Sequence, residues 1–296
     1  MAETTWLTPA LISRLEALQL SVRWVRAGHK LGGHFAINRR GSSIEFADHT
    51  AYYPGDDIRA IDWNLYARLD KLFIKTYREE IALSVELIVD ATASMGLPTE
   101  EKFARATQLA VSLGYVGLTG HHHVRLSWIA PGRRVDASPW FHHRGDLFRM
   151  AEAAVAVRPA GQVSYPDWMR RAVSALRTRG GQAILITDGM VRPADFFAAL
   201  HVLRIRNVEV KVLQVLTPQE LHPARLLRGG TLVDAETGAT HQLAYSAEQL
   251  ERAVLEHNEL LSRFCKRHGI PFAQHRLDEP LETFITKVLP VRGFLE

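Results

Sequence analysis

Two short apolar runs that each end in an aspartate most constrain the fold of this chain of 296 residues. Residues 85–89 (Val-Glu-Leu-Ile-Val) precede Asp90, and residues 183–187 (Ala-Ile-Leu-Ile-Thr) precede Asp188. Runs of this length and composition are typical of buried strands in a parallel sheet. Because parallel strands point the same way, both aspartates are expected at the carboxyl edge of one sheet.

Strand-like and helix-like segments alternate from residue 85 onward. Helices are expected at 100–119, 145–156, 166–178, 193–204 and 246–268, and further strands at 124–129, 208–216 and 271–275. This alternation predicts an α/β fold, a mostly parallel sheet with helices on both faces. We expect this domain to span residues 81–296 and to include a hairpin insertion at 225–245, with strands at 231–233 and 241–243.

Residues 1–80 are expected to form an N-terminal extension that packs on the main domain. Its first helix begins at Thr8-Pro9, a favoured cap followed by proline in the first turn. Apolar residues at spacings of three and four continue to Val25, so this helix is expected to end near Gly28.

The composition is that of an ordinary globular protein, with 47% hydrophobic and 23% charged residues and a net charge of +4. No long run of Lys or Arg is present, so a nucleic-acid partner is not expected. The single cysteine, Cys265, excludes an internal disulfide and is expected to be a buried structural thiol. The first residues do not form a signal peptide, and no apolar segment is long enough to span a membrane. A cytoplasmic location is therefore expected.

Oxygen-bearing side chains follow the first strand at alternate positions. Asp90, Thr92 and Ser94 supply a carboxylate and two hydroxyls, Asp188 a second carboxylate, and Ser164 a third hydroxyl from the intervening loop. Hard cations prefer such ligands, so these five residues predict a Mg²⁺ site that Mn²⁺ or Ca²⁺ could also occupy. Taken alone, Asp90, Thr92 and Ser94 could instead cap a helix.

This arrangement resembles the metal-ion-dependent adhesion site of von Willebrand factor A domains. That site has Asp-x-Ser-x-Ser followed by a distant Thr and a distant Asp. Here Thr92 stands where Ser is usual, and Ser164 stands where Thr is usual, and both changes keep the hydroxyl. The resemblance implies a von Willebrand factor A-like, Rossmann-like sheet.

A second block of residues resembles a narrower family, the bacterial "domain of unknown function 58" proteins, which carry such a domain. The matching residues are Tyr53, Pro54, Gly55, Asp56, Asp57, Arg59, Asp62, Trp63 and Arg68. The resemblance implies a non-enzymatic adaptor or co-chaperone that works with a MoxR-type AAA+ ATPase in maturing or remodelling target proteins. It also implies that a client protein donates an Asp or Glu to the metal.

The block at 53–68 has two compatible interpretations. In the structural one, Pro54-Gly55 forms a turn, Ile61 and Trp63 enter the core, and the charged residues form an ion-pair network that pins the extension to the sheet. In the other, the dense charges form an interaction surface.

Other functions receive less support from the sequence. A phosphatase-like hydrolase would use Asp90 as nucleophile, but Thr92 stands where its general acid would be needed, so no catalytic residue is assigned. The histidine runs at 121–123 and 142–143 are expected to be exposed turn residues, because adjacent side chains on a strand point in alternate directions and do not converge on one ion.

Overall fold

The computed structural model describes residues 6–22, 44–79, 82–132, 134–175, 181–206, 208–223, 231–233, 240–242 and 246–296. The chain divides into two units, residues 1–22 with 83–296, and residues 23–82. The prediction placed residues 1–80 in one extension, whereas residues 1–22 group with the sheet and the smaller unit begins at residue 23. The first 22 residues belong with the sheet because Leu11 and Leu15 are buried in its core.

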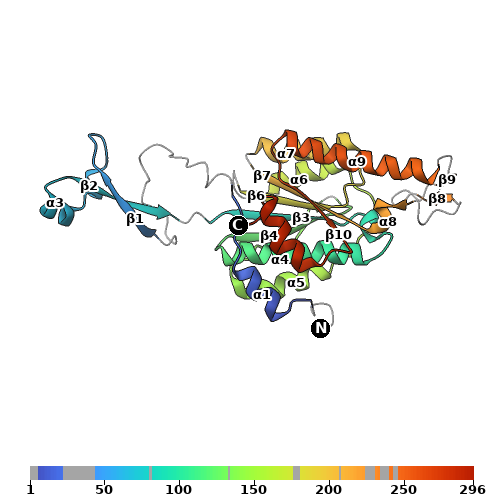
Figure 1. The fold of residues 1–296 in the computed structure, drawn as a ribbon, viewed down its shortest axis with the longest axis horizontal. Helices are drawn as coiled ribbons and strands as arrows, with labels where there is room; N and C mark the ends of the chain where they lie inside the picture. Colours follow the sequence, from blue (N-terminus) through green and yellow to red (C-terminus); the bar gives the residue numbers. More distant parts are fainter. Residues whose placement is uncertain are drawn as a thin grey trace. The chain divides into compact units, whose positions relative to one another are not determined.

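A six-stranded sheet forms the centre of the larger unit (Figure 1). Its strands, in spatial order, are β10 (Phe272–Arg276), β7 (Glu209–Leu216), β6 (Gln182–Thr187), β3 (Ser84–Asp90), β4 (His123–Ile129) and β5 (Asp136–Ala137). The first five are parallel, and the short edge strand β5 pairs antiparallel with β4. The five parallel strands agree with the predicted ones, and the two-residue strand β5 was not predicted.

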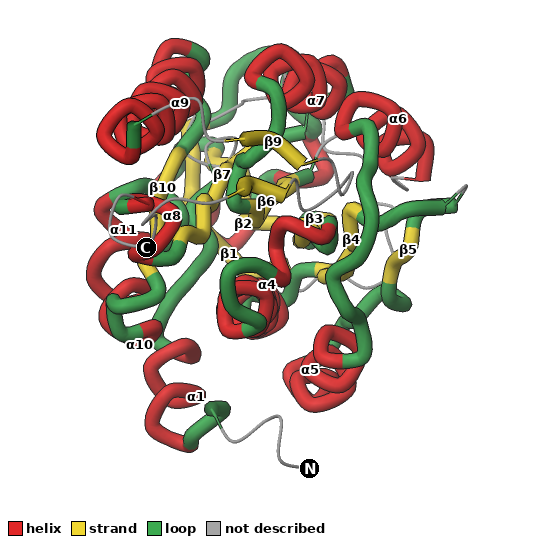
Figure 2. Tube along the Cα trace, turned by 90° about the vertical axis from the view of Figure 1, so that its right-hand side faces the viewer, coloured by secondary structure: helices red, strands yellow, loops and turns green. Residues whose placement is uncertain are grey.

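Helices cover both faces of this sheet (Figure 2). One face carries α1 (Pro9–Glu16), α4 (Glu101–Thr119), α5 (Leu147–Val155) and the C-terminal turns α10 (Leu281–Thr283), η6 (Phe284–Val288) and α11 (Leu289–Val291). The other carries α6 (Tyr165–Ala175), α7 (Pro193–Ile205) and α9 (Ala247–Arg267). Strand β3 contributes to both cores, Leu87 to one and Ile88 to the other. The predicted α/β fold, a mostly parallel sheet covered on both faces, is confirmed.

The first helix is shorter than predicted. Thr8 caps α1 by accepting a hydrogen bond from the Leu11 amide at 3.2 Å, and Pro9 starts the first turn. The helix ends at Glu16 rather than near Gly28, because the following backbone pairs with the C-terminus: the Ser21 amide donates to the Phe294 carbonyl at 3.0 Å. The Ser21 carbonyl in turn accepts from Gln182 Nε2 at 3.0 Å, at the start of β6.

The order of the strands places the ends of β3 and β6 at a switch point. From β3 the chain crosses to β4 on one side, and it then returns to β6 on the other side of β3. Both strands are parallel, with Val89 of β3 opposite Ile186 of β6. In open α/β sheets, ligands bind beyond the carboxyl ends of strands at such a point. Asp90 and Asp188 both lie there.

The smaller unit contains an antiparallel pair, β1 (Ile44–Ala51) and β2 (Phe73–Glu79), with η2 (Ile58–Ala60) and α3 (Trp63–Leu69) between them. Asp62 caps α3 by accepting from the amides of Asn64 and Leu65. Ile61 is buried as predicted, but the prediction for Trp63 is wrong, because 61% of this residue is exposed at the first position of α3.

The charged residues of the 53–68 block make separate local contacts. Asp56 accepts from the Tyr53 amide at 2.8 Å, and Asp57 lies 3.8 Å from the exposed Arg59. Asp62 Oδ2 lies 2.9 Å from His49 Nε2. Among the described residues, these contacts shape the turn and the start of α3, and none of them joins Asp56, Asp57 and Asp62 into one ion-pair network.

The predicted hairpin is present as β8 (Thr231–Val233) paired antiparallel with β9 (Thr240–Gln242). Its connection, residues 234–239, lies outside the described residues. Within the described residues, each helix is either too short or too polar to cross a bilayer.

Candidate metal centre

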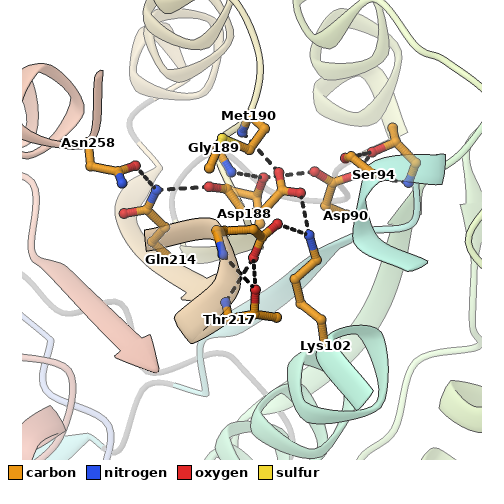
Figure 3. A network of polar contacts seen from close by, with 12 residues as sticks. Asp90, Ser94, Lys102, Asp188, Gly189, Met190, Gln214, Thr217 and Asn258 are labelled. Carbon is orange, nitrogen blue, oxygen red and sulfur yellow. Dashed lines mark hydrogen bonds and ion pairs between the residues drawn. The ribbon is translucent and has the colours of Figure 1, made fainter. Parts of the chain in front are cut away.

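Asp90 is the centre of a hydrogen-bonded cluster at the carboxyl end of β3 (Figure 3). Its Oδ1 accepts from the amide and the hydroxyl of Thr92 at 3.0 and 2.7 Å. Its Oδ2 accepts from the hydroxyl of Thr187 at 2.7 Å and from the phenol of Tyr165. Ser94 Oγ lies 3.1 Å from Thr92 Oγ1. Three predicted ligands, Asp90, Thr92 and Ser94, are therefore brought together.

The environment of Asp90 disfavours a bare negative charge. Burial of the carboxyl, and then repulsion from Asp188, raise its pKa, while the hydrogen bonds from Tyr165, Thr92 and Thr187 act in the opposite direction. Burial and the two carboxylates also raise the pKa of Tyr165 well above 10, so its phenol keeps the proton that it donates to Asp90. A positive charge near Asp90 would relieve the remaining repulsion.

Asp188 is held by a buried lysine from α4. Lys102 Nζ lies 2.9 Å from Asp188 Oδ2 and 2.5 Å from Glu220 Oε1, and the lysine side chain is 0% exposed. Glu220 comes from α8 (Pro218–Leu221). Burial lowers the pKa of Lys102, but the two carboxylates outweigh it and the pKa is raised. Lys102 is therefore charged and bridges two segments of the chain.

The backbone around Asp188 is fixed by further contacts. The amide of Met190 donates to Asp188 Oδ1 at 2.9 Å, and Gln214 Nε2 donates to the Asp188 carbonyl at 2.8 Å. Gly189 has a φ of +71°, and a Cβ on it would lie 2.8 Å from Leu261 Cδ1. A glycine is therefore required at the turn that presents Asp188.

The charges of this cluster fit a divalent cation. When all are ionised, Asp90, Asp188 and Glu220 carry three negative charges and Lys102 one positive charge, a net of −2. Burying uncompensated charge is unfavourable, and one divalent cation would balance this set. The carboxylates and the hydroxyls of Thr92 and Ser94 are oxygen donors, which Mg²⁺ prefers. Within the described residues, no group of three or more His, Cys, Asp or Glu side chains is placed so that it could hold a metal ion, so the hydroxyls are a necessary part of this donor set.

Ser164 is placed differently from the other four predicted ligands. Its loop lies against the loop after β3, because the Ala93 amide donates to the Gly161 carbonyl at 2.9 Å. Ser164 itself is exposed, and its side chain hydrogen-bonds the carboxylate of Asp167 in the first turn of α6. The next residue, Tyr165, reaches Asp90 instead.

Four residues of the cluster were missed by sequence reasoning: Thr187, Tyr165, Lys102 and Glu220. Lys102 had a usable signal, since it lies in phase with the buried residues Ala106 and Leu109 of α4, where a charged side chain is unusual. Glu220 completes a capping box with Thr217, which predicts the start of α8 but not the contact with Lys102.

The structure also bears on two alternatives. Thr92 precedes η3 (Ala93–Gly96) without making a side-chain capping bond, and its hydroxyl donates to Asp90 instead. The helix-cap interpretation therefore does not explain these residues. Asp90 is fully buried and accepts four hydrogen bonds, which disfavours the nucleophile of a hydrolase.

Comparisons with known proteins find a matching family, relatives in sequence and solved structures of similar fold. The family described as "Protein of unknown function DUF58" matches residues 48–259. An uncharacterized protein of Mycobacterium bovis is 26% identical over 91% of this chain and 86% of its own length. Among solved structures, the conserved hypothetical protein BatB from Bacteroides thetaiotaomicron is 14% identical, over 72% of this chain and 99% of BatB, with a TM-score of 0.43. A von Willebrand factor type A structure from Catenulispora acidiphila is 14% identical, over 75% of this chain and 43% of that chain, with a TM-score of 0.37.

Proposed function

The chain belongs to the DUF58 family of proteins of unknown function, and we propose that it is a non-enzymatic protein-interaction module. Its partner would bind at a rim formed by Asp90, Thr92, Ser94 and Asp188, and this binding requires a divalent cation. The observation that carries this proposal is the pair of buried carboxyl groups of Asp90 and Asp188 beside the hydroxyls of Thr92 and Ser94, a set of oxygen donors whose negative charge a cation would offset. Mg²⁺ is the best-matched cation, and Mn²⁺ also accepts these ligands.

The residues have distinct parts in this function. Thr92 and Ser94 supply hydroxyl oxygens, and Asp90 and Asp188 supply the negative charge. Tyr165 and Thr187 hold Asp90 in place. When bound, the cation supplies an open coordination position for a carboxylate of a partner protein. Recognition would then require both the metal and an acidic residue of the partner.

The proposed partner is a MoxR-type AAA+ ATPase, with this chain as its adaptor or co-chaperone toward a client protein. The resemblance of the 53–68 block to proteins encoded beside such ATPases supports this partner. The sequence contains no G-x-x-x-x-G-K-[ST] phosphate-binding motif, so the ATPase would hydrolyse the nucleotide.

The test uses the full-length chain and a purified MoxR-type ATPase from the same organism. Calorimetry measures Mg²⁺ binding, and co-sedimentation measures complex formation with and without EDTA. Asp90→Asn keeps the size of the side chain and removes its charge, so both kinds of binding should be lost while the circular dichroism spectrum is kept.

Asp278→Asn is the matched control, because this exposed carboxylate pairs with Arg276 and lies outside the cluster. Its binding of Mg²⁺ and of the ATPase should equal that of the wild type. Normal Mg²⁺ binding by Asp90→Asn, or complex formation that EDTA leaves unchanged, would overturn the proposal.

A further inference from the structure

Two of the five histidines in the runs at 121–123 and 142–143 face each other. His123 is the first residue of β4, and His142 directly follows Phe141, which pairs with Val124 of that strand. Their Nδ1 atoms lie 2.6 Å apart, and their ring centres 4.5 Å apart. The pair lies at the amino end of β4, and the Asp90 cluster lies at the carboxyl end of the parallel strand β3.

The backbone explains why the rings meet. Val124 and Phe141 exchange two hydrogen bonds, with N–O distances of 3.0 and 2.8 Å, and form an antiparallel bridge. His123 and His142 are therefore the next opposed pair, which makes no mutual backbone hydrogen bonds and in which side chains approach most closely. Val124 and Phe141 point into the core, so the two histidines point to the opposite face.

The backbone of His142 is held in position by Asp146. Asp146 Oδ2 accepts from the amides of His142 and His143, at 3.1 and 3.2 Å. The ring of His143 accepts from the Asp146 amide in the same capping arrangement, and its centre lies 6.4 Å from the centre of the His142 ring. His142 is exposed and His123 is half-buried, so the pair lies at the surface of the sheet unit.

We propose that His123 and His142 form a surface site for a borderline divalent transition metal, Zn²⁺, Ni²⁺ or Cu²⁺, separate from the rim at Asp90. Imidazole nitrogen suits these ions, and it does not suit Mg²⁺. Metal–nitrogen bonds of about 2.0–2.1 Å at a tetrahedral angle separate two ligand nitrogens by roughly 3.3 Å. The rings therefore move apart by roughly 0.7 Å, which exposed side chains accommodate by small rotations.

Two protein ligands make this an open and exchangeable site. Within the described part of the chain, no third His, Cys, Asp or Glu joins the pair as a metal ligand. Water or a donor from another molecule fills the remaining positions. Burial and the neighbouring His142 lower the pKa of His123, which keeps a neutral ring available for the metal near pH 7.

The experiment uses the full-length chain without a histidine tag. Isothermal titration with Zn²⁺ should show one equivalent bound by the wild type. His142→Gln and His123→Gln should each weaken binding about tenfold or more, because each removes one of two ligands. His121→Asn is the control, since this exposed neighbour in the same run has a φ of +59° that Asn tolerates, and it should bind Zn²⁺ like the wild type.

A second measurement needs no variant. Electron paramagnetic resonance of the Cu²⁺ complex of the wild type should show coupling to two imidazole nitrogens. The proposal is overturned if the wild type takes up no Zn²⁺, if either glutamine variant binds as tightly as the wild type, or if Cu²⁺ is coordinated without two imidazoles. Asp90→Asn should leave Zn²⁺ binding unchanged, which separates this site from the rim.

Discussion

Replacing Lys102 by methionine tests the electrostatics of the cluster most directly. The change keeps the length of the side chain and removes an ammonium that contacts Asp188 at 2.9 Å and Glu220 at 2.5 Å. Removing one partner of a buried ion pair costs about 3–5 kcal/mol, because the other charge is left uncompensated. Two carboxylates share this lysine, so we expect a loss near the upper end, about 5 kcal/mol, of a total stability that is typically about 5–15 kcal/mol.

The same variant should respond strongly to Mg²⁺. Without Lys102 the ionised cluster carries −3 rather than −2, so a divalent cation should bind more tightly than in the wild type. A ligand at 100 times its Kd stabilises the folded state by about 2.7 kcal/mol. The difference in stability between variant and wild type should therefore be smaller in Mg²⁺ than in EDTA.

The assay is urea unfolding followed by circular dichroism, in EDTA and in excess Mg²⁺. Lys287→Met is the control, because Lys287 is exposed and its loss should change the free energy of unfolding by no more than about 0.5 kcal/mol. A loss below about 1 kcal/mol for Lys102→Met would refute the buried ion pair. Weaker Mg²⁺ binding by this variant than by the wild type would refute the reasoning about the cation.

Three further predictions concern buried groups. His275 is buried, and its Nε2 accepts a hydrogen bond from Arg105 at 2.9 Å. Burial and the charge of Arg105 lower the pKa of His275 to about 3, so the folded state keeps this ring neutral. Stability should fall by about 2 kcal/mol as pH drops from 7 to 5, through the unfolded-state value near 6.5; His275→Gln should lack this part of the loss in urea titrations at the two pH values. Tyr165→Phe removes a donor to Asp90 and should reduce the free energy of unfolding by about 1–3 kcal/mol, and an unchanged urea midpoint would contradict the bond. Burial raises the pKa of Cys265 to about 12, so a thiol reagent should modify it only after unfolding, and rapid labelling of the native chain would disprove this.

Much of the fold could be predicted because its strands are local apolar runs. The segments 85–89 and 183–187 match β3 and β6 closely, and their direction already brings Asp90 and Asp188 to one edge. The end of α1 could not be predicted, because residues at the far end of the chain pair with its continuation.

The candidate site, like the fold, could be predicted where its residues are close together in the sequence. Asp90, Thr92 and Ser94 lie within five residues, so their alternation is visible in the sequence. Tyr165 joins them through tertiary packing, which periodicity does not reveal. The helical phase of Lys102 indicates that it is buried, but it does not reveal that Asp188 is its partner. The histidine pair could not be predicted for the same reason, because its two residues come one from each run and meet only in the folded chain.

The point at which the second unit joins the sheet has a consequence for what sets the strand order. The backbone leaves the sheet unit after Val22 and returns at Leu83. The two junctions are neighbours, because the Ser21 carbonyl accepts from Gln182, which is the residue opposite Val85 in the sheet. The sheet unit therefore fixes both ends of this interval through its own contacts, so its strand order and register are set by residues that lie outside the interval.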